Sequence, residues 1–226
     1  MNKAIIMYAP PGAGKGTQAK LLVEKFHLVH FDTGAYIENL VHDPVKLKSK
    51  TVQRERRIYD TGTLNTPSWV LKIVKQHTKE IHDAGLGVVF SGSPRTMFEA
   101  FGDAKTEGFI SFLTRAYGKE NIIFIQLIVD ASKSVLRNNR RLVCSMCRSS
   151  VLGIYHHLKI CPSCGGKLVK RTLDNPEKHK MRIEQYIQRT KPILQELRRH
   201  GYRIVSIDGT PMPYAVFRNI VKKISR

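Results

Sequence analysis

A glycine-rich stretch with a single lysine lies near the start of the chain, where residues 9–17 read Ala-Pro-Pro-Gly-Ala-Gly-Lys-Gly-Thr. Phosphate groups need backbone N–H groups at close range, which glycines allow, and the N-terminus of a following helix adds positive potential. Lys15 is expected to reach the terminal phosphates of a nucleotide, and the Thr17 hydroxyl to approach magnesium or phosphate. The pattern predicts a phosphate-binding loop with contacts from Gly12, Ala13, Gly14, Lys15, Gly16 and Thr17.

Four cysteines form two Cys-x-x-Cys pairs, Cys144 with Cys147 and Cys161 with Cys164. Each pair lets two thiolates reach one metal ion, and four thiolates give the closed tetrahedral site of structural zinc. A segment this small cannot bury a core of its own, so we expect the metal to stabilise it. Four free or redox-active cysteines are the alternative, because the 13 residues between the pairs are slightly fewer than usual. The spacing does not separate zinc from iron.

The composition is that of a globular chain with a strong positive charge. Of 226 residues, 38 are Lys or Arg and 18 are Asp or Glu, giving a formal net charge of +20. Because the basic residues are spread along the whole chain, we expect no specific nucleic-acid partner, which would favour a clustered stripe. No apolar run approaches the length of a membrane span, and no signal-type segment opens the chain. We therefore expect a cytoplasmic protein without a membrane partner.

Apolar runs alternate with helical periodicity along most of the chain. Buried strands are expected at 3–8, 28–31, 87–90, 122–129 and 203–207, and helices at 14–26, 67–84, 132–142, 175–200 and 213–224. Thr66 followed by Pro67, and Asn175 followed by Pro176, are typical helix starts in which the first residue caps the helix. Strands that alternate with helices predict an α/β fold, with a parallel sheet covered on both faces.

Two segments interrupt this alternation. Residues 32–66 are polar and charged and are expected to form a small helical insertion, and residues 143–170 hold the cysteines and show no periodicity. The predicted organisation is a core of residues 1–31, 67–142 and 171–226, with insertions at 32–66 and 143–170.

The loop and four later motifs together resemble the adenylate kinase family over nearly the whole chain. Asp32-Thr33-Gly34 and Thr61-Gly62-Thr63-Leu64 resemble the two ends of its monophosphate-binding insertion. Gly92-Ser93-Pro94-Arg95-Thr96 resembles its Asp-Gly-Phe-Pro-Arg-Thr signature, and Asp208-Gly209-Thr210 resembles a late turn near the adenine of ATP. The resemblance implies a three-layer P-loop NTPase core with a nucleoside-monophosphate-binding insertion at 32–66 and a zinc-binding lid at 143–170.

The same resemblance gives roles to five arginines, which suit phosphoryl transfer because the planar guanidinium binds phosphate oxygens and stays charged. Arg95 matches the arginine that binds the monophosphate. Arg137 and Arg141 match a pair at the lid hinge that contacts the phosphates of ATP. Arg171 and Arg182 match two arginines that converge on the transferred phosphate. For any one of them alone, a solvated surface charge is the simpler interpretation.

The remaining site residues are implied by their place in the matching motifs. Ile154, Tyr155 and Pro211 are expected beside the base and ribose of ATP, with Tyr155-His156 resembling a Tyr-His pair of the family. The resemblance implies that AMP binds Thr33, Glu38, Thr63, Leu64, Asn65, Gly92, Ser93, Pro94, Arg95, Glu99, Arg171 and Arg182. The basic cluster Arg54, Arg56 and Arg57 is a possible further phosphate contact.

Five positions depart from the family's pattern. Glu38 falls where an arginine holds the phosphate of AMP, and Ala35 falls where an aspartate is usual. Ser91 replaces an aspartate that orders magnesium through water, and Leu173 replaces an acidic residue after the lid. Glu99 replaces the glutamine that hydrogen-bonds adenine. An ionised glutamate only accepts hydrogen bonds, and guanine offers two donors on that edge, so Glu99 weakens the assignment of AMP and strengthens that of a GMP-like acceptor.

The function expected from the resemblance is reversible transfer of the terminal phosphoryl group of Mg-ATP to AMP, with magnesium as the cofactor of ATP and zinc structural in the lid. A kinase for another nucleoside monophosphate is the first alternative. A nucleotide-binding protein that has lost efficient transfer is the second. We expect a monomer.

Overall fold

The computed structural model describes residues 3–170 and 176–225. Its centre is a parallel sheet of five strands: β1 (Ala4–Tyr8), β2 (Val29–Phe31), β3 (Val88–Phe90), β4 (Ile122–Ile128) and β8 (Ile204–Asp208). Their spatial order is β2-β3-β1-β4-β8, so the strand that feeds the glycine-rich loop is central. All five strands lie within two residues of their predicted places, because each is a short apolar run bounded by polar or turn residues.

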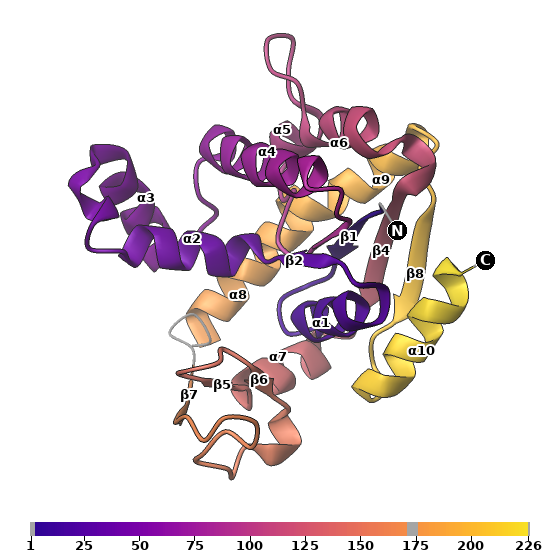
Figure 1. The fold of residues 1–226 in the computed structure, drawn as a ribbon. Helices are drawn as coiled ribbons and strands as arrows, with labels where there is room; N and C mark the ends of the chain where they lie inside the picture. The colour runs from indigo at the N-terminus through magenta and orange to yellow at the C-terminus, as the bar shows by residue number, and fades with distance from the viewer. Residues whose placement is uncertain (1–2, 171–175, 226) are drawn as a thin grey trace.

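Helices cover both faces of this sheet, as Figure 1 shows. Ile5 and Met7 of β1 pack with α1 (Lys15–Phe26) and α10 (Pro213–Ile224) on one face. Ala4, Ile6 and Tyr8 face the other layer, which contains α4 (Pro67–Asp83), α5 (Met97–Phe101), α6 (Phe109–Tyr117) and α9 (Lys191–Arg199). The strand is apolar throughout because both of its faces are buried. The predicted three-layer α/β core with a parallel sheet is confirmed.

The chain leaves the core between β2 and α4. Residues 33–61 form α2 (Thr33–His42), a single 3₁₀ turn η1 (Lys46–Lys48) and α3 (Lys50–Thr61). In Figure 1, α2 and α3 extend to one side of the sheet, in indigo and violet. The segment was expected to be helical, and it is.

A second excursion follows β4. The helix α7 (Ala131–Asn139) leads into a three-stranded antiparallel sheet of β5 (Leu142–Cys144), β6 (Ser150–Val151) and β7 (Leu168–Val169), with a 3₁₀ turn η3 (Gly153–Tyr155). The expected helix over 132–142 is therefore too long, because Leu142 already pairs with Val151 in the small sheet. The chain returns through α8 (Pro176–Gln185) and a π-helical turn η5 (Tyr186–Thr190), which runs into α9.

Three other features differ from the sequence prediction. The helices α5 and α6 lie where no element was predicted. The expected single helix over 175–200 contains the π turn between α8 and α9, and Asn175 lies outside the described residues. Thr66 precedes α4 but its side chain does not cap that helix; its hydroxyl donates instead to Glu55 at 2.6 Å.

Among the described residues, no helix combines the length and apolar character that crossing a membrane requires.

Candidate active site

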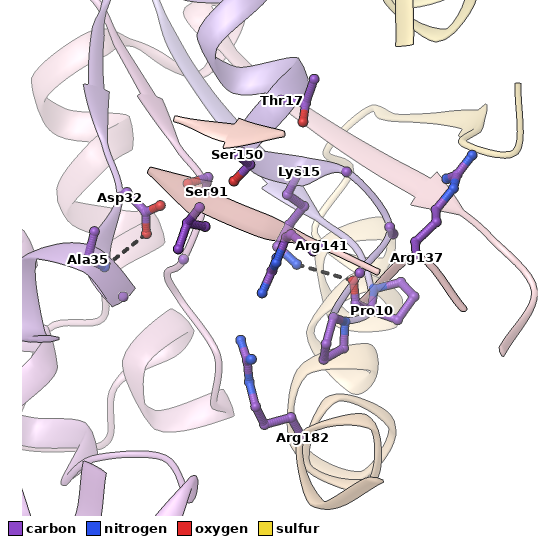
Figure 2. Close-up of a pocket in the computed structure, with 18 of the residues that line it drawn as sticks. Pro10, Lys15, Thr17, Asp32, Ala35, Ser91, Arg137, Arg141, Ser150 and Arg182 are labelled. Atoms are coloured by element: carbon purple, nitrogen blue, oxygen red, sulfur yellow. Dashed lines mark hydrogen bonds between the residues drawn. The ribbon is translucent and has the colours of Figure 1, made fainter. Parts of the chain in front are cut away.

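A cleft of about 470 Å³ opens at the carboxyl ends of β1, β2 and β3. Its walls come from the glycine-rich loop, the start of α2, the segment that returns from α3, the loop after β3, and the lid, which is the segment from β5 to β7. Figure 2 shows part of this cleft, with side chains from the glycine-rich loop, the start of α2, the loop after β3 and the lid around Lys15. Parallel α/β sheets usually bind ligands at this edge.

The loop after β1 needs glycine at two positions. Gly12 and Gly14 have φ angles of 81° and 90°, a left-handed backbone that other residues rarely adopt. A side chain on Gly12 would also meet the Ser134 carbonyl oxygen at 2.5 Å, because α7 lies directly against the loop. The Ser134 hydroxyl donates to the Pro11 carbonyl across the same contact. The loop is thus held between the sheet and the hinge of the lid.

Lys15 begins α1 and turns back under the loop, where its Nζ donates to the Ala9 carbonyl at 2.6 Å. Burial, followed by the positive charges of Arg95, Arg182 and Arg141, lowers the pKa of this ammonium to about 7. Asp32 acts in the opposite direction. Such a concentration of positive charge in a partly buried cleft is favourable only when an anion occupies it.

The arginines reach the cleft from different elements. Arg95 follows β3 and donates through Nε to the Gly92 carbonyl at 2.7 Å, which orients its guanidinium. Arg141 follows α7, and Arg182 projects from α8; Figure 2 shows both directed toward the region around Lys15. Arg137 donates to the carbonyls of Gly209 at 2.7 Å and Thr210 at 2.6 Å, so it joins α7 to the loop after β8.

Glu99 also lines the cleft; it lies on the first turn of α5 and is 3 % exposed. Its Oε2 accepts from the Arg95 backbone N–H at 2.8 Å and its Oε1 from the Thr96 hydroxyl at 3.1 Å. The Thr96 hydroxyl in turn accepts from the Glu99 N–H at 3.1 Å. These bonds form a reciprocal cap at the start of α5. The carboxylate therefore stabilises this helix as well as lining the cleft.

A second buried carboxylate holds the segment that returns from the insertion. Glu55 of α3 is fully buried, and its oxygens accept from the Asn65 amide at 3.0 Å, the Thr66 N–H at 3.0 Å and the Thr66 hydroxyl at 2.6 Å. Arg54 also donates to it at 2.8 Å. The chain between α3 and α4 is thereby fixed to α3 in front of the cleft.

The four cysteine sulfurs form one cluster. All four Sγ atoms lie within 4.8 Å of one another, with Cys144 and Cys164 at 3.4 Å and Cys147 and Cys161 at 3.8 Å. Zinc–thiolate bonds of about 2.3 Å in a tetrahedron place sulfurs about 3.8 Å apart, so these residues fit such an ion. None of the four is in a disulfide. The hydrophobic contacts of the lid are few: Cys144, Cys161 and Leu168 are its buried centre.

Most residues assigned to nucleotides from the sequence line this cleft. They are Gly12, Ala13, Gly14, Lys15, Gly16, Thr17, Thr33, Glu38, Thr63, Leu64, Asn65, Gly92, Ser93, Arg95, Glu99, Arg137, Arg141, Ile154, Arg182 and Pro211. Pro94 instead borders a neighbouring cavity of about 60 Å³, and Tyr155 is 48 % exposed and not among the lining residues. Arg171 and Leu173 lie outside the described residues.

Sequence reasoning gave no role to three residues that the structure places at or beside the cleft. Asp32 was noted only as part of a motif, although it lines the cleft and its negative charge acts on Lys15. Arg148 of the lid lines the cleft and donates to the Asn39 side chain of α2 at 3.1 Å, which joins the lid to the insertion. Glu55 was overlooked because it lies within a run of basic residues. The expected phosphate contacts of Arg54, Arg56 and Arg57 are not supported, since none of these three arginines lines the cleft.

Comparison with known proteins agrees with this geometry. The family model described as adenylate kinase matches residues 7–202. An adenylate kinase of Clostridium tetani is 31% identical over 226 residues, which cover 96% of this chain and 95% of the relative. An adenylate kinase of Alkaliphilus oremlandii is 32% identical, covering 97% of both chains, and one of Petrotoga mobilis is 28% identical, covering 91% and 89%. The chain therefore belongs to the adenylate kinase family, whose members are phosphotransferases that convert ATP and AMP into two ADP.

Proposed function

We propose that this chain transfers the terminal phosphoryl group of Mg-ATP to AMP, and that the residues around Lys15 carry the step. One observation supports this most directly: the positive charges of Arg95, Arg141 and Arg182, from three separate parts of the chain, act on Lys15 within one cleft. Phosphoryl transfer needs little more from the protein than positioning of the reactants and neutralisation of charge on the transferred group.

In this proposal the two nucleotides enter from opposite sides of the positive cluster. The loop from Gly12 to Thr17 holds the phosphates of ATP, with Arg137 and Arg141 at the lid hinge. Arg95 holds the phosphate of the acceptor, and Arg182 neutralises the group in transfer. Arg171 has the same role by resemblance alone. The acceptor oxygen attacks the terminal phosphorus directly, and ADP leaves from the other side, so no covalent intermediate with the protein forms.

Magnesium would be held at the phosphate end, where its charge offsets that of the phosphates. Oxygen atoms are the ligands that it prefers, and Thr17, Asp32 and Ser91 all bring side-chain oxygens to the cleft, where they would act on the ion directly or through its waters. The bases would lie at the two ends. Ile154 and Pro211 line the ATP end, whereas Leu64, Asn65 and Glu99 line the acceptor end. We keep Tyr155 as a proposed contact of ATP that closure of the lid would bring in.

GMP is a second candidate acceptor, favoured by one specific feature. The Glu99 carboxylate already accepts two hydrogen bonds from its own turn, and while it is ionised it offers only further acceptors to a base. Guanine presents hydrogen-bond donors on the edge that would face Glu99, whereas adenine N1 is an acceptor and requires a donor from the protein. A member of the family that binds nucleotides but transfers weakly is the remaining alternative.

We also propose that the four cysteines hold a structural zinc ion in the lid. The sulfur spacing fits a closed tetrahedral site, which leaves no open position for a substrate. Reduced thiolates require a reducing compartment, which supports a cytoplasmic location. The proposed solution state is a monomer, which sedimentation would test.

A coupled assay with ATP and each of AMP, GMP, CMP and UMP tests the proposed reaction. We expect AMP to be used, with GMP as its nearest competitor. Lys15→Ala should lower kcat by at least about 10²–10³-fold, because a charge that stabilises the transferring group is lost. Lys25→Ala is the matched control, since Lys25 lies exposed on the last turn of the same helix. Activity that survives Lys15→Ala within a few fold would overturn the assignment of the loop.

A further inference from the structure

Asp32 and Ser91 leave neighbouring strands at the same level of the sheet. The parallel strands β2 and β3 are paired in register, with Phe31 opposite Phe90, so the residues that follow them lie side by side. The Ser91 N–H points to the Phe31 carbonyl at 3.4 Å, and Figure 2 shows Asp32 and Ser91 next to each other. Both line the cleft that holds Lys15.

One of the two carboxylate oxygens of Asp32 accepts a hydrogen bond from the protein. Its Oδ1 accepts from the Ala35 N–H at 3.2 Å, which caps the start of α2. Within the part of the chain that the structure describes, Oδ2 has no hydrogen-bond partner. A side chain on Gly34 would lie 3.4 Å from Asp32 Oδ1 and 3.5 Å from the Arg95 Nη2 atom. Gly34 therefore adds no side chain beside this carboxylate and the Arg95 guanidinium.

Asp32 is the carboxylate at the phosphate end of the cleft. Among the described residues, two other acidic residues line the cleft, Glu38 and Glu99. Both oxygens of Glu99 accept hydrogen bonds at the start of α5, and Glu38 is six residues further along the insertion than Asp32. Among the charges that act on Lys15, those of Arg95, Arg182 and Arg141 are positive, and that of Asp32 is negative.

A carboxylate in this place would repel the phosphates that the surrounding cations attract, unless a cation stood between them. Magnesium meets that need, because it binds phosphates while keeping several waters, and carboxylates accept hydrogen bonds from those waters. The neighbouring Ser91 has a short, uncharged side chain, and its hydroxyl is engaged with His30 Nε2 at 2.8 Å, so Asp32 is the charged group of the pair.

From this geometry we propose that Asp32 is the residue that positions the hydrated magnesium ion of Mg-ATP, through its Oδ2 atom. The proposal rests on the proposed function, since it assumes that ATP binds at the glycine-rich loop. Asp32 acts on the metal's water shell and is a positioning residue.

The test is the affinity of manganese, as a magnesium substitute, for the complex of the intact protein with ATP, measured by electron paramagnetic resonance. Asp32→Asn keeps the cap of α2, because asparagine caps helices as well as aspartate does. We expect it to weaken manganese binding about 10-fold or more, as loss of an outer-sphere partner usually does. Affinity for ATP in EDTA should be unchanged or higher, because a negative charge near the phosphates is removed.

Two further variants make the result specific. Adding Ser91→Asp to Asp32→Asn returns a carboxylate to the adjacent strand end and should restore most of the manganese affinity. Glu24→Gln makes the same chemical change on an exposed part of α1 and should alter nothing.

Unchanged manganese affinity in Asp32→Asn would overturn the proposal, and so would an equal loss of ATP affinity in EDTA, which would indicate a structural role. Phosphoryl transfer by the unmodified protein is measured separately. Absence of phosphoryl transfer would refute the proposed function. Normal transfer, together with a manganese affinity that Asp32→Asn does not change, would refute only this inference.

Discussion

Glu99 Oε2 accepts a hydrogen bond from the backbone N–H of Arg95 at 2.8 Å, so the residue proposed to face the acceptor base is tied to the residue proposed to hold its phosphate. Burial raises the pKa of Glu99 to about 6, although the hydrogen bond from Arg95 and its positive charge both act to lower it. The carboxyl group therefore changes its protonation state close to neutral pH. When protonated it can donate to a base, and when ionised it can only accept.

The preference between AMP and GMP should follow this titration. As the pH falls through about 6, Glu99 gains a proton and a donor for adenine N1, so the ratio of kcat/KM for AMP over GMP should rise. Glu99→Gln should raise that ratio about 5- to 150-fold at pH 8, which corresponds to one base contact of about 1–3 kcal/mol, and should remove its pH dependence. Taking the ratio cancels the titration of the monophosphate itself. A ratio that neither pH nor the variant changes would mean that Glu99 does not face the base.

Glu55 should stabilise the insertion by holding the chain that leads into α4. Glu55→Ala removes the acceptor of the Thr66 N–H and one of the two acceptors of the buried Asn65 amide, and we expect it to lower the free energy of unfolding by about 2–4 kcal/mol. Lys50→Ala, at an exposed position of the same helix, should change it by less than about 0.5 kcal/mol. Denaturant titration measures both, and hydrogen exchange at residues 50–66 locates the effect.

Acid should act through the same group. Burial of Glu55 opposes its ionisation, but hydrogen bonds from Thr66, Asn65 and Arg54 outweigh it and lower the pKa below the ordinary value of 4.5. A lowered pKa in the folded state gives stability that is present above the unfolded value and lost as the pH falls through the folded one. Glu55→Gln should therefore be less stable than the unmodified protein at pH 7, with the difference shrinking below pH 4.5. An equal difference at both pH values would mean that the charge of Glu55 contributes nothing.

The parts of this protein that sequence reasoning predicted well are those in which local pattern decides the structure. The run Ala4–Tyr8 is apolar on both faces and can only be an interior strand, and the glycines at 12 and 14 are needed for a left-handed backbone. The helix α5 was not predicted because it has only five residues, too few to show a helical period. It ends at Gly102, where a side chain would clash with the Thr106 carbonyl oxygen.

The proposed role of Asp32 could not be predicted from the sequence, for a different reason. Its neighbour Ser91 is 59 residues away in the chain, and only the register of β2 with β3 brings the two together. Glu55 is a similar case. A glutamate among arginines is usually a solvated surface charge, and the burial of Glu55 depends on Asn65 and Thr66, which follow 10 and 11 residues later. Long-range pairing of this kind leaves no periodic signal.

Binding of ATP should take up a proton at Lys15. With a pKa of about 7, this amine is mostly neutral in the free protein at pH 8, and the phosphates of ATP raise that pKa, so the amine becomes charged on binding. Calorimetry in two buffers of different ionisation enthalpy should give an uptake of close to one proton, about 0.9, at pH 8 and less at pH 6. Lys15→Arg is the control, since arginine stays charged and should bind ATP without uptake. Heats that do not depend on the buffer in the unmodified protein would refute the lowered pKa.

Removal of the metal should destabilise the lid without removing the ATP site of the core. Protein purified without added metal should contain about one zinc ion per chain by elemental analysis, because four thiolates close one tetrahedral site. Cys161→Ser replaces a buried ligand and should release the zinc, whereas Ser163→Ala, at an exposed position of the same loop, should retain it.

The consequences for the fold should be local. The lid has three residues in its buried cluster, and two of them are cysteines, so little holds it together once the metal is gone. We expect amide protons of residues 142–169 to lose protection from exchange in Cys161→Ser, while those of β1 and β4 keep theirs. Affinity for ATP should fall less than the stability of the lid, because Lys15 and its loop belong to the core. Protein that holds neither zinc nor iron, or a variant whose lid stays protected, would show that the cysteines do not form a structural metal site.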